Sequence, residues 1–134
     1  MRSLLLFASL LAATPALSAA PPRPGADPAL DHCLARSPGA TPGITHVLGC
    51  YRAAQERVDT AIAAAYRAQQ ARLTARAVPP ATLDAGETAW RSYRDRWCAF
   101  ESAAESDPGS REATGLECRV EVAQAHLARL RGAN

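Results

Sequence analysis

The sequence predicts an all-α fold: a small antiparallel bundle of three main helices plus a short N-terminal helix, held by two disulfides. Three observations lead to this prediction. Apolar residues recur every three or four positions over three segments, which is the pattern of a helix with one buried face. Stretches rich in proline and glycine separate these segments. No segment alternates apolar and polar residues as a half-buried strand would.

Residues 1–20 have the pattern of a secretory signal peptide. Arg2 precedes a short apolar run, and small residues follow that run. The run is shorter than the ~20 apolar residues that a membrane-spanning helix needs. Residues 21–29 are proline-rich and predict a flexible leader, so the helical domain is expected over residues 30–131. Because no cysteine follows the signal peptide closely, we expect a periplasmic or secreted protein that is not lipid-anchored.

The short N-terminal helix is expected over Asp31–Arg36, before a loop over Ser37–Gly43. The first main helix is expected over Thr45–Ala77, a segment without proline. It is expected to end before Val78, because the two prolines that follow Val78 lack an amide hydrogen and restrict the residue before them. Its apolar stripe consists of Val47, Tyr51, Ala54, Val58, Ala61, Ile62, Ala65 and Tyr66.

The second main helix is expected to begin at Thr82, whose side chain can cap it, and to end before a turn at Ser106–Ser110. Its predicted inner face is aromatic and consists of Leu83, Trp90, Tyr93, Trp97, Phe100 and Ala104. The third main helix is expected over Glu112–Arg131, before Gly132, a common helix terminator. Its predicted inner face consists of Leu116, Val120, Ala123, Leu127 and Leu130.

Four cysteines in a small exported chain predict two disulfides, for which three pairings are possible. Cys98 and Cys118 lie at similar distances from the turn that separates their helices, so they can meet across a helical hairpin. Cys33 precedes a loop that can return the chain to Cys50. The predicted bridges are therefore Cys33–Cys50 and Cys98–Cys118. Each closes a loop of roughly twenty residues, which stabilises a fold by about 3 kcal/mol on loop-entropy estimates.

A run in the second main helix carries a specific motif, whose members are Glu87, Trp90, Tyr93, Arg94, Asp95 and Cys98. The run resembles the core motif of the lysozyme inhibitor LprI-like domain family, whose members are small, exported and helical. The resemblance covers residues 30–131 and includes Cys50, Asp59, Tyr66 and Cys118. It implies an exported helical protein that binds and inhibits lysozyme or a related peptidoglycan-cleaving enzyme. The alternative is a periplasmic adaptor or structural module that binds an envelope protein and inhibits nothing.

The two tryptophans of the motif, Trp90 and Trp97, are seven residues apart and share one helix face. We interpret them as core anchors; the alternative is an exposed aromatic pair that stacks on a sugar or on a partner protein. Arg94 and Asp95 are adjacent and point in different directions, so we expect no simple pair between them. Arg94 can reach a tryptophan or an acid on a neighbouring helix, and Asp95 can meet Arg91.

Charged residues of the second main helix offer two further hypotheses for partner binding. Arg91, Arg94 and Arg96 could form a cationic cluster, because guanidinium groups suit the carboxylates of a partner. A cationic lysozyme would instead favour an acidic patch on the inhibitor. The candidate residues for that patch are Asp84, Glu101, Glu105 and Asp107.

The composition argues against other functional classes. The formal net charge is only +2, so we expect no nucleic-acid partner. His32, His46 and His126 lie in different elements without metal-ligand spacing, so we expect no metal and no cofactor. No nucleophile has a histidine and an acid at a recognisable spacing, so we expect a binding protein and not an enzyme.

Overall fold

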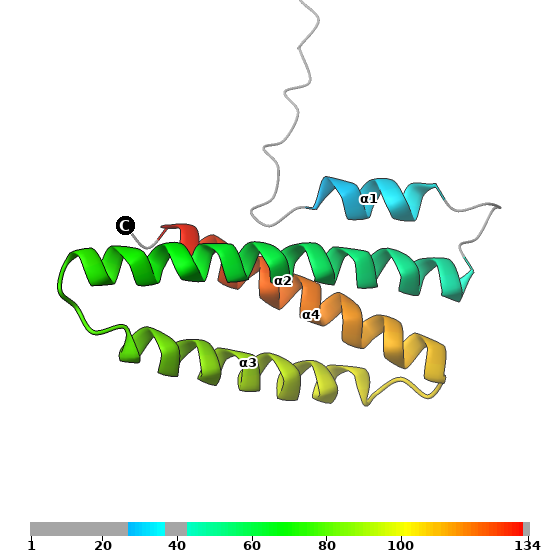
Figure 1. Cartoon of the computed structure of the whole chain (residues 1–134). Coiled ribbons are helices and arrows are strands. Elements are labelled where there is room, and N and C mark those ends of the chain that lie inside the picture. The colour runs from blue at the N-terminus through cyan, green and yellow to red at the C-terminus, as the bar shows by residue number, and fades with distance from the viewer. Residues whose placement is uncertain (1–26, 37–42, 133–134) are drawn as a thin grey trace, which may run out of the picture.

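The computed structural model describes residues 27–36 and 43–132, which fold into four helices (Figure 1). Consecutive long helices run antiparallel, so α2 and α4 point the same way (Figure 1). The all-α prediction and the number of helices are confirmed. The predicted signal peptide, most of the predicted leader and the loop after Arg36 lie outside the described residues. The helices are α1 (Pro28–Ala35), α2 (Ile44–Ala75), α3 (Ala81–Ser102) and α4 (Pro108–Gly132).

The apolar core lies between α2 and α4, and α1 lies along α2 on the other side (Figure 1). Small side chains let α2 and α4 approach closely, because Ala54 and Ala123 are completely buried. Tyr51 of α2 donates a hydrogen bond to Glu117 of α4 at 2.8 Å, near one end of the interface. The core cluster consists of Val58, Ile62, Ala123, Leu127 and Leu130.

Helix α3 packs on α4 and contributes little apolar surface to the core. Its only buried residues are Glu87 and Cys98. Tyr93, Trp97 and Phe100 are exposed, so the prediction that they belong to the inner face is wrong. Neighbouring helical positions differ by about 100° in direction, and Cys98, rather than Trp97, is the residue that faces α4.

The starts of α1, α3 and α4 differ more from the predictions than that of α2, which begins one residue early at Ile44. Helix α1 begins at Pro28 because the Asp27 side chain accepts hydrogen bonds from the amides of the first turn, so the end of the predicted leader is helical. Helix α3 begins at Ala81 after Pro80, and not with Thr82 as its cap. Helix α4 begins at Pro108, inside the predicted turn.

The start of α4 is set by Asp107. Its carboxylate accepts a hydrogen bond from the Ser110 amide at 2.7 Å, and this bond lowers the pKa of Asp107. Asp-Pro at both Asp27 and Asp107 is a start signal in the sequence itself, because an acidic cap followed by proline suits the first turn of a helix.

Both predicted disulfides are confirmed. Cys33–Cys50 joins α1 to α2, with Cα atoms 5.7 Å apart. Cys98–Cys118 joins α3 to α4, with Cα atoms 5.5 Å apart. Helix α1 has no buried residue and α3 has two. Each of these helices therefore depends on its disulfide, whereas α2 and α4 are held together by their shared apolar core.

Replacing the α3–α4 bridge with alanine (Cys98→Ala with Cys118→Ala) should lower the free energy of unfolding by about 3 kcal/mol in urea denaturation. Amide exchange should accelerate along α3, because few buried side chains remain to hold it. The matched control removes Cys33–Cys50, which spans a similar sequence separation of 17 against 20 residues. It should accelerate exchange in α1 and leave α3 protected; unchanged exchange in α3 after loss of its own bridge would contradict this account.

Alkaline stability should depend on Tyr51. Burial and the hydrogen bond to Glu117 raise its pKa to about 12 from a usual value of 10.0. Because the folded pKa is the higher one, the neutral hydroxyl stabilises the fold fully below pH 10.0, and that contribution is lost as the pH rises towards 12. Tyr51→Phe should flatten this loss in urea titrations, whereas Tyr93→Phe, on an exposed residue, should leave it unchanged. Equal losses in wild type and Tyr51→Phe would refute the assignment.

Candidate partner-binding surface

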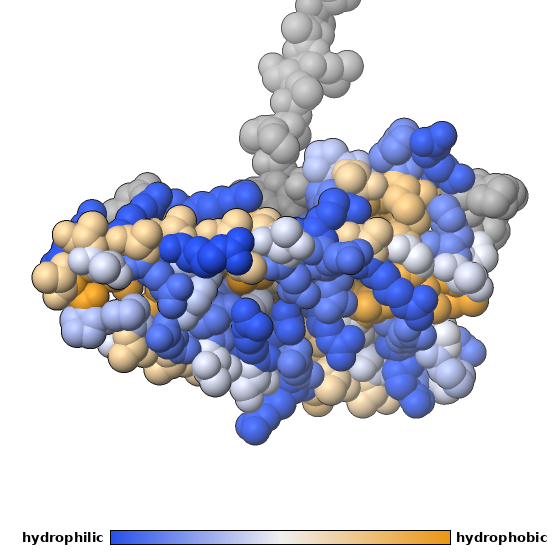
Figure 2. Space-filling view, in the orientation of Figure 1, coloured by the Kyte–Doolittle hydropathy of each residue, from blue (hydrophilic) through white to orange (hydrophobic). Residues whose placement is uncertain are grey.

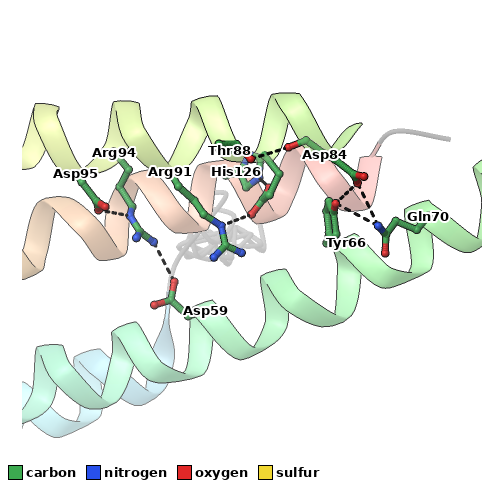
Figure 3. Close-up of polar contacts among 10 residues, drawn as sticks. Asp59, Tyr66, Gln70, Asp84, Thr88, Arg91, Arg94, Asp95 and His126 are labelled. Carbon is green, nitrogen blue, oxygen red and sulfur yellow. Dashed lines mark hydrogen bonds and ion pairs between the residues drawn. The ribbon is translucent and has the colours of Figure 1, made fainter. Parts of the chain in front are cut away.

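Polar and charged side chains on the inner face of α3 join this helix to both other long helices (Figure 3). They are here called the polar column, which consists of Glu87, Arg91 and Arg94 of α3 with their partners His126 of α4 and Asp59 of α2. Glu87, only 7% exposed, faces His126 of α4, with Oε2 and Nε2 2.7 Å apart. Its other oxygen, Oε1, accepts a hydrogen bond from Arg91 Nε at 3.1 Å. A buried carboxylate is costly unless it is paired, and here two partners from two helices satisfy it.

Trp90 lies beside this pair and packs against the α2–α4 core. Its ring stacks on His126 with centroids 3.8 Å apart and planes 9° apart. The guanidinium carbon of Arg94 lies 5.1 Å from the centroid of the Trp90 ring, within cation–π range. The interpretation of Trp90 as an anchor is therefore confirmed.

Arg94 connects α3 to α2 (Figure 3). Its Nη1 lies 3.1 Å from Asp59 Oδ1 on α2, and its Nε lies 3.1 Å from Asp95 Oδ1. The expected pairing with an acid on a neighbouring helix is confirmed. The expectations that Arg94 would not pair with Asp95, and that Asp95 would meet Arg91, are wrong. The long Arg94 side chain bends to reach its neighbour, and Arg91 is held by Glu87 instead.

The residues predicted to bind a partner are therefore not one cluster. Arg91 and Arg94 have carboxylate partners within the protein, and Asp107 caps α4. Of the predicted acidic patch, Asp84 accepts hydrogen bonds from Tyr66 and Gln70 of α2 (Figure 3). Arg96 differs, because it lines a hollow on the outer face of α3.

That outer face carries the most exposed aromatic side chains among the described residues. Tyr93, Trp97 and Phe100, here called the aromatic ridge, are 54%, 42% and 70% exposed. They contact each other in sequence, with ring centroids 6.2 Å apart for Tyr93–Trp97 and 5.7 Å apart for Trp97–Phe100. Together with Ala89, Ser92 and Arg96 they line a shallow hollow. Of the two interpretations of the tryptophans, the exposed position thus fits Trp97, and the core anchor fits Trp90.

Contiguous exposed aromatics on a rigid helix are typical of a protein-binding surface. Aromatic residues and arginine supply most of the energetically dominant contacts at interfaces, and large exposed apolar patches are uncommon unless they bind something. The aromatic ridge with Arg96 is therefore the candidate partner-binding surface. The sequence contained the signal, a run of aromatics at helical spacing, but the predicted direction of that run was inward.

The cysteine and histidine groups do not build a metal site in the oxidised protein. Among the described residues, Cys33, His46 and Cys50 place possible ligand atoms close together. Both sulfur atoms, however, belong to the disulfide. His46 Nε2 instead lies 2.9 Å from the carbonyl oxygen of Cys33 and thereby links α2 to α1.

None of the described helices is long and apolar enough to cross a membrane.

Comparison with known proteins identifies a family. Residues 36–130 match the family model described as Lysozyme inhibitor LprI. The matched segment contains α2, α3 with its motif, and all of α4 except its last two residues. No curated protein and no solved structure matches the chain.

Arg94 and Arg96 provide a paired test of the polar column. Arg94→Lys keeps the charge but loses the planar group that reaches two carboxylates and the Trp90 ring, so it should lower the free energy of unfolding by about 1 kcal/mol. Arg96→Lys, two residues along the same helix and exposed, should leave it unchanged within error. Urea denaturation of both variants measures the difference, and equal effects would show that Arg94 does not hold α3 to α2.

Proposed function

This chain belongs to the LprI family of lysozyme inhibitors, and we propose that it is exported and inhibits a lysozyme or a related peptidoglycan-cleaving enzyme. The family match carries the proposal. Two further observations support export: the N-terminal sequence has a signal-peptide pattern, and all four cysteines pair in disulfides, as is typical of oxidising compartments. An inhibitor family also argues against a catalytic role for the chain itself.

We propose that the enzyme is bound through the aromatic ridge and Arg96. The three aromatic rings can be desolvated on binding without unfolding the inhibitor, since none of them supports the α2–α4 core. Arg96 places a guanidinium beside them. Glycosidases position two carboxylates around the bond that they cleave, and a guanidinium suits such groups. The ridge would then block access of the polysaccharide to the enzyme.

The direct test measures lysis of peptidoglycan by chicken-, goose- and invertebrate-type lysozymes with and without the purified oxidised protein. We expect stoichiometric inhibition of one type. Reducing the disulfides should abolish this inhibition, because α3 would lose its covalent link to α4. Binding without inhibition would favour the adaptor function, and no binding to any type at high micromolar concentration would contradict both the inhibitor proposal and the role of the ridge.

Single serine substitutions locate the surface. Trp97→Ser and Phe100→Ser should each raise the inhibition constant by about 30-fold, the effect of a residue that contributes about 2 kcal/mol to binding. The matched control is Ile44→Ser, because Ile44 is exposed to 44%, similar to the 42% of Trp97, but lies outside the ridge. All three variants should unfold at nearly the urea concentration of the wild type. Full inhibition by the ridge variants would place the contact elsewhere.

A further inference from the structure

A second concave surface lies at the end of the molecule where α2 and α4 end and α3 begins. This terminal cleft has a volume of about 1010 Å³ and is lined by residues of all three long helices. We propose that it binds a single-chain anionic amphiphile, meaning a carboxylate or phosphate on an apolar chain. The proposal does not rest on lysozyme inhibition, because the cleft uses the first half of α3 and the aromatic ridge uses the second.

The walls of the terminal cleft are mainly apolar. Leu73 and Val78 come from the end of α2 and the connection after it, Leu83 and Trp90 from α3, and Leu130 from α4. Figure 2 shows apolar residues reaching the surface at this end of the molecule, as they also do at the opposite end near α1. Small-molecule sites are concave, of about 300–1,000 Å³, and mostly apolar with a few polar groups. The terminal cleft has this character, and its size suits a ligand with a long apolar part.

The charged residues around the terminal cleft favour a negatively charged ligand. Arg72, Arg76 and Arg129 line it, and all three are exposed. Among the described residues that line it, the acidic one is Glu87, which is buried and paired with His126 and Arg91. Guanidinium groups bind carboxylate and phosphate through paired hydrogen bonds. A ligand with an anionic head at the arginines and an apolar chain along the leucines therefore matches both parts of the cleft.

The back of the terminal cleft is already rigid. Trp90 is stacked on His126 and contacted by Arg94, so its ring need not be ordered when a ligand arrives. A preorganised wall reduces the entropic cost of binding. Trp90 also provides a direct optical signal, because the sequence contains only one other tryptophan, Trp97, which belongs to the ridge.

The test uses three probes with the same twelve-carbon chain, each below its critical micelle concentration: dodecanoate, dodecyl phosphate and dodecyltrimethylammonium. Isothermal titration should show saturable binding of one anionic molecule per chain, and Trp97→Phe protein should report it through Trp90 fluorescence. Binding of both anions, or of either one alone, supports the proposal and identifies which head group is recognised. No saturable binding of either anion, or equal binding of the cationic probe, overturns it.

Two sets of variants separate the cleft from general hydrophobic adsorption. Gly86 lines the cleft, and a Cβ there would meet no atom within 4 Å, so Gly86→Phe should fill the cleft and weaken anion binding by at least about tenfold. The matched control is Gly49→Phe on α2, because Gly49 is also helical and exposed, has the same open surroundings and lies outside the cleft.

The second set removes charge and keeps the cavity. Arg76→Gln with Arg129→Gln should weaken the binding of both anionic probes by about tenfold. Binding of the cationic probe should be unchanged or slightly stronger. Arg67→Gln, an exposed α2 residue outside the cleft lining, should change neither. Undiminished anion binding in Gly86→Phe, or in the double arginine variant, would overturn the assignment even if one of the variants proved less stable.

Discussion

The placement of α3 depends on a single column of interacting side chains, in which the Trp90 ring contacts His126 of α4 and the guanidinium of Arg94. Glu87 pairs with His126, and Arg94 pairs with Asp59 of α2. Helix α3 is thus held mainly by polar and aromatic contacts, whereas α2 and α4 are held together by apolar packing. Since the column occupies the inner face of α3, the remaining aromatic side chains of the helix have no place in the core and lie on the outside.

The rest of the bundle shows why such a column and two disulfides are needed. The core between α2 and α4 is built largely from alanine, valine and leucine. These small side chains let the two helices approach closely, but each of them buries little apolar area. Small domains bury a smaller fraction of their surface than large domains do, and they often depend on covalent links. Here each link joins a helix with few or no buried side chains to one of the two helices that form the core.

Because few side chains of α3 are buried, most of its surface is available for binding. A helix that is held by one polar face, one half-buried tryptophan and one disulfide can present the aromatic ridge along its second half and line the terminal cleft along its first. Most residues of the α3 motif then fall into two groups. Glu87, Trp90, Arg94 and Cys98 position the helix, and Tyr93 is the motif residue that belongs to the exposed ridge.

Local features of the sequence were sufficient to predict the helices, the two disulfides and the family motif, because helical periodicity, proline breaks and cysteine spacing all act over short stretches of chain. The Asp-Pro starts of α1 and α4 were equally local, although their significance became clear only in the structure. The direction of α3 was different. By composition its aromatic residues belong inside and its Glu87 and Arg94 outside, and the structure reverses Trp97 and Glu87. Burying a charged group is favourable only when partners compensate it, and those partners, His126 and Asp59, are 39 and 35 residues away in the chain. Only the tertiary structure brings them together, so only the tertiary structure decides which face of α3 is free to bind.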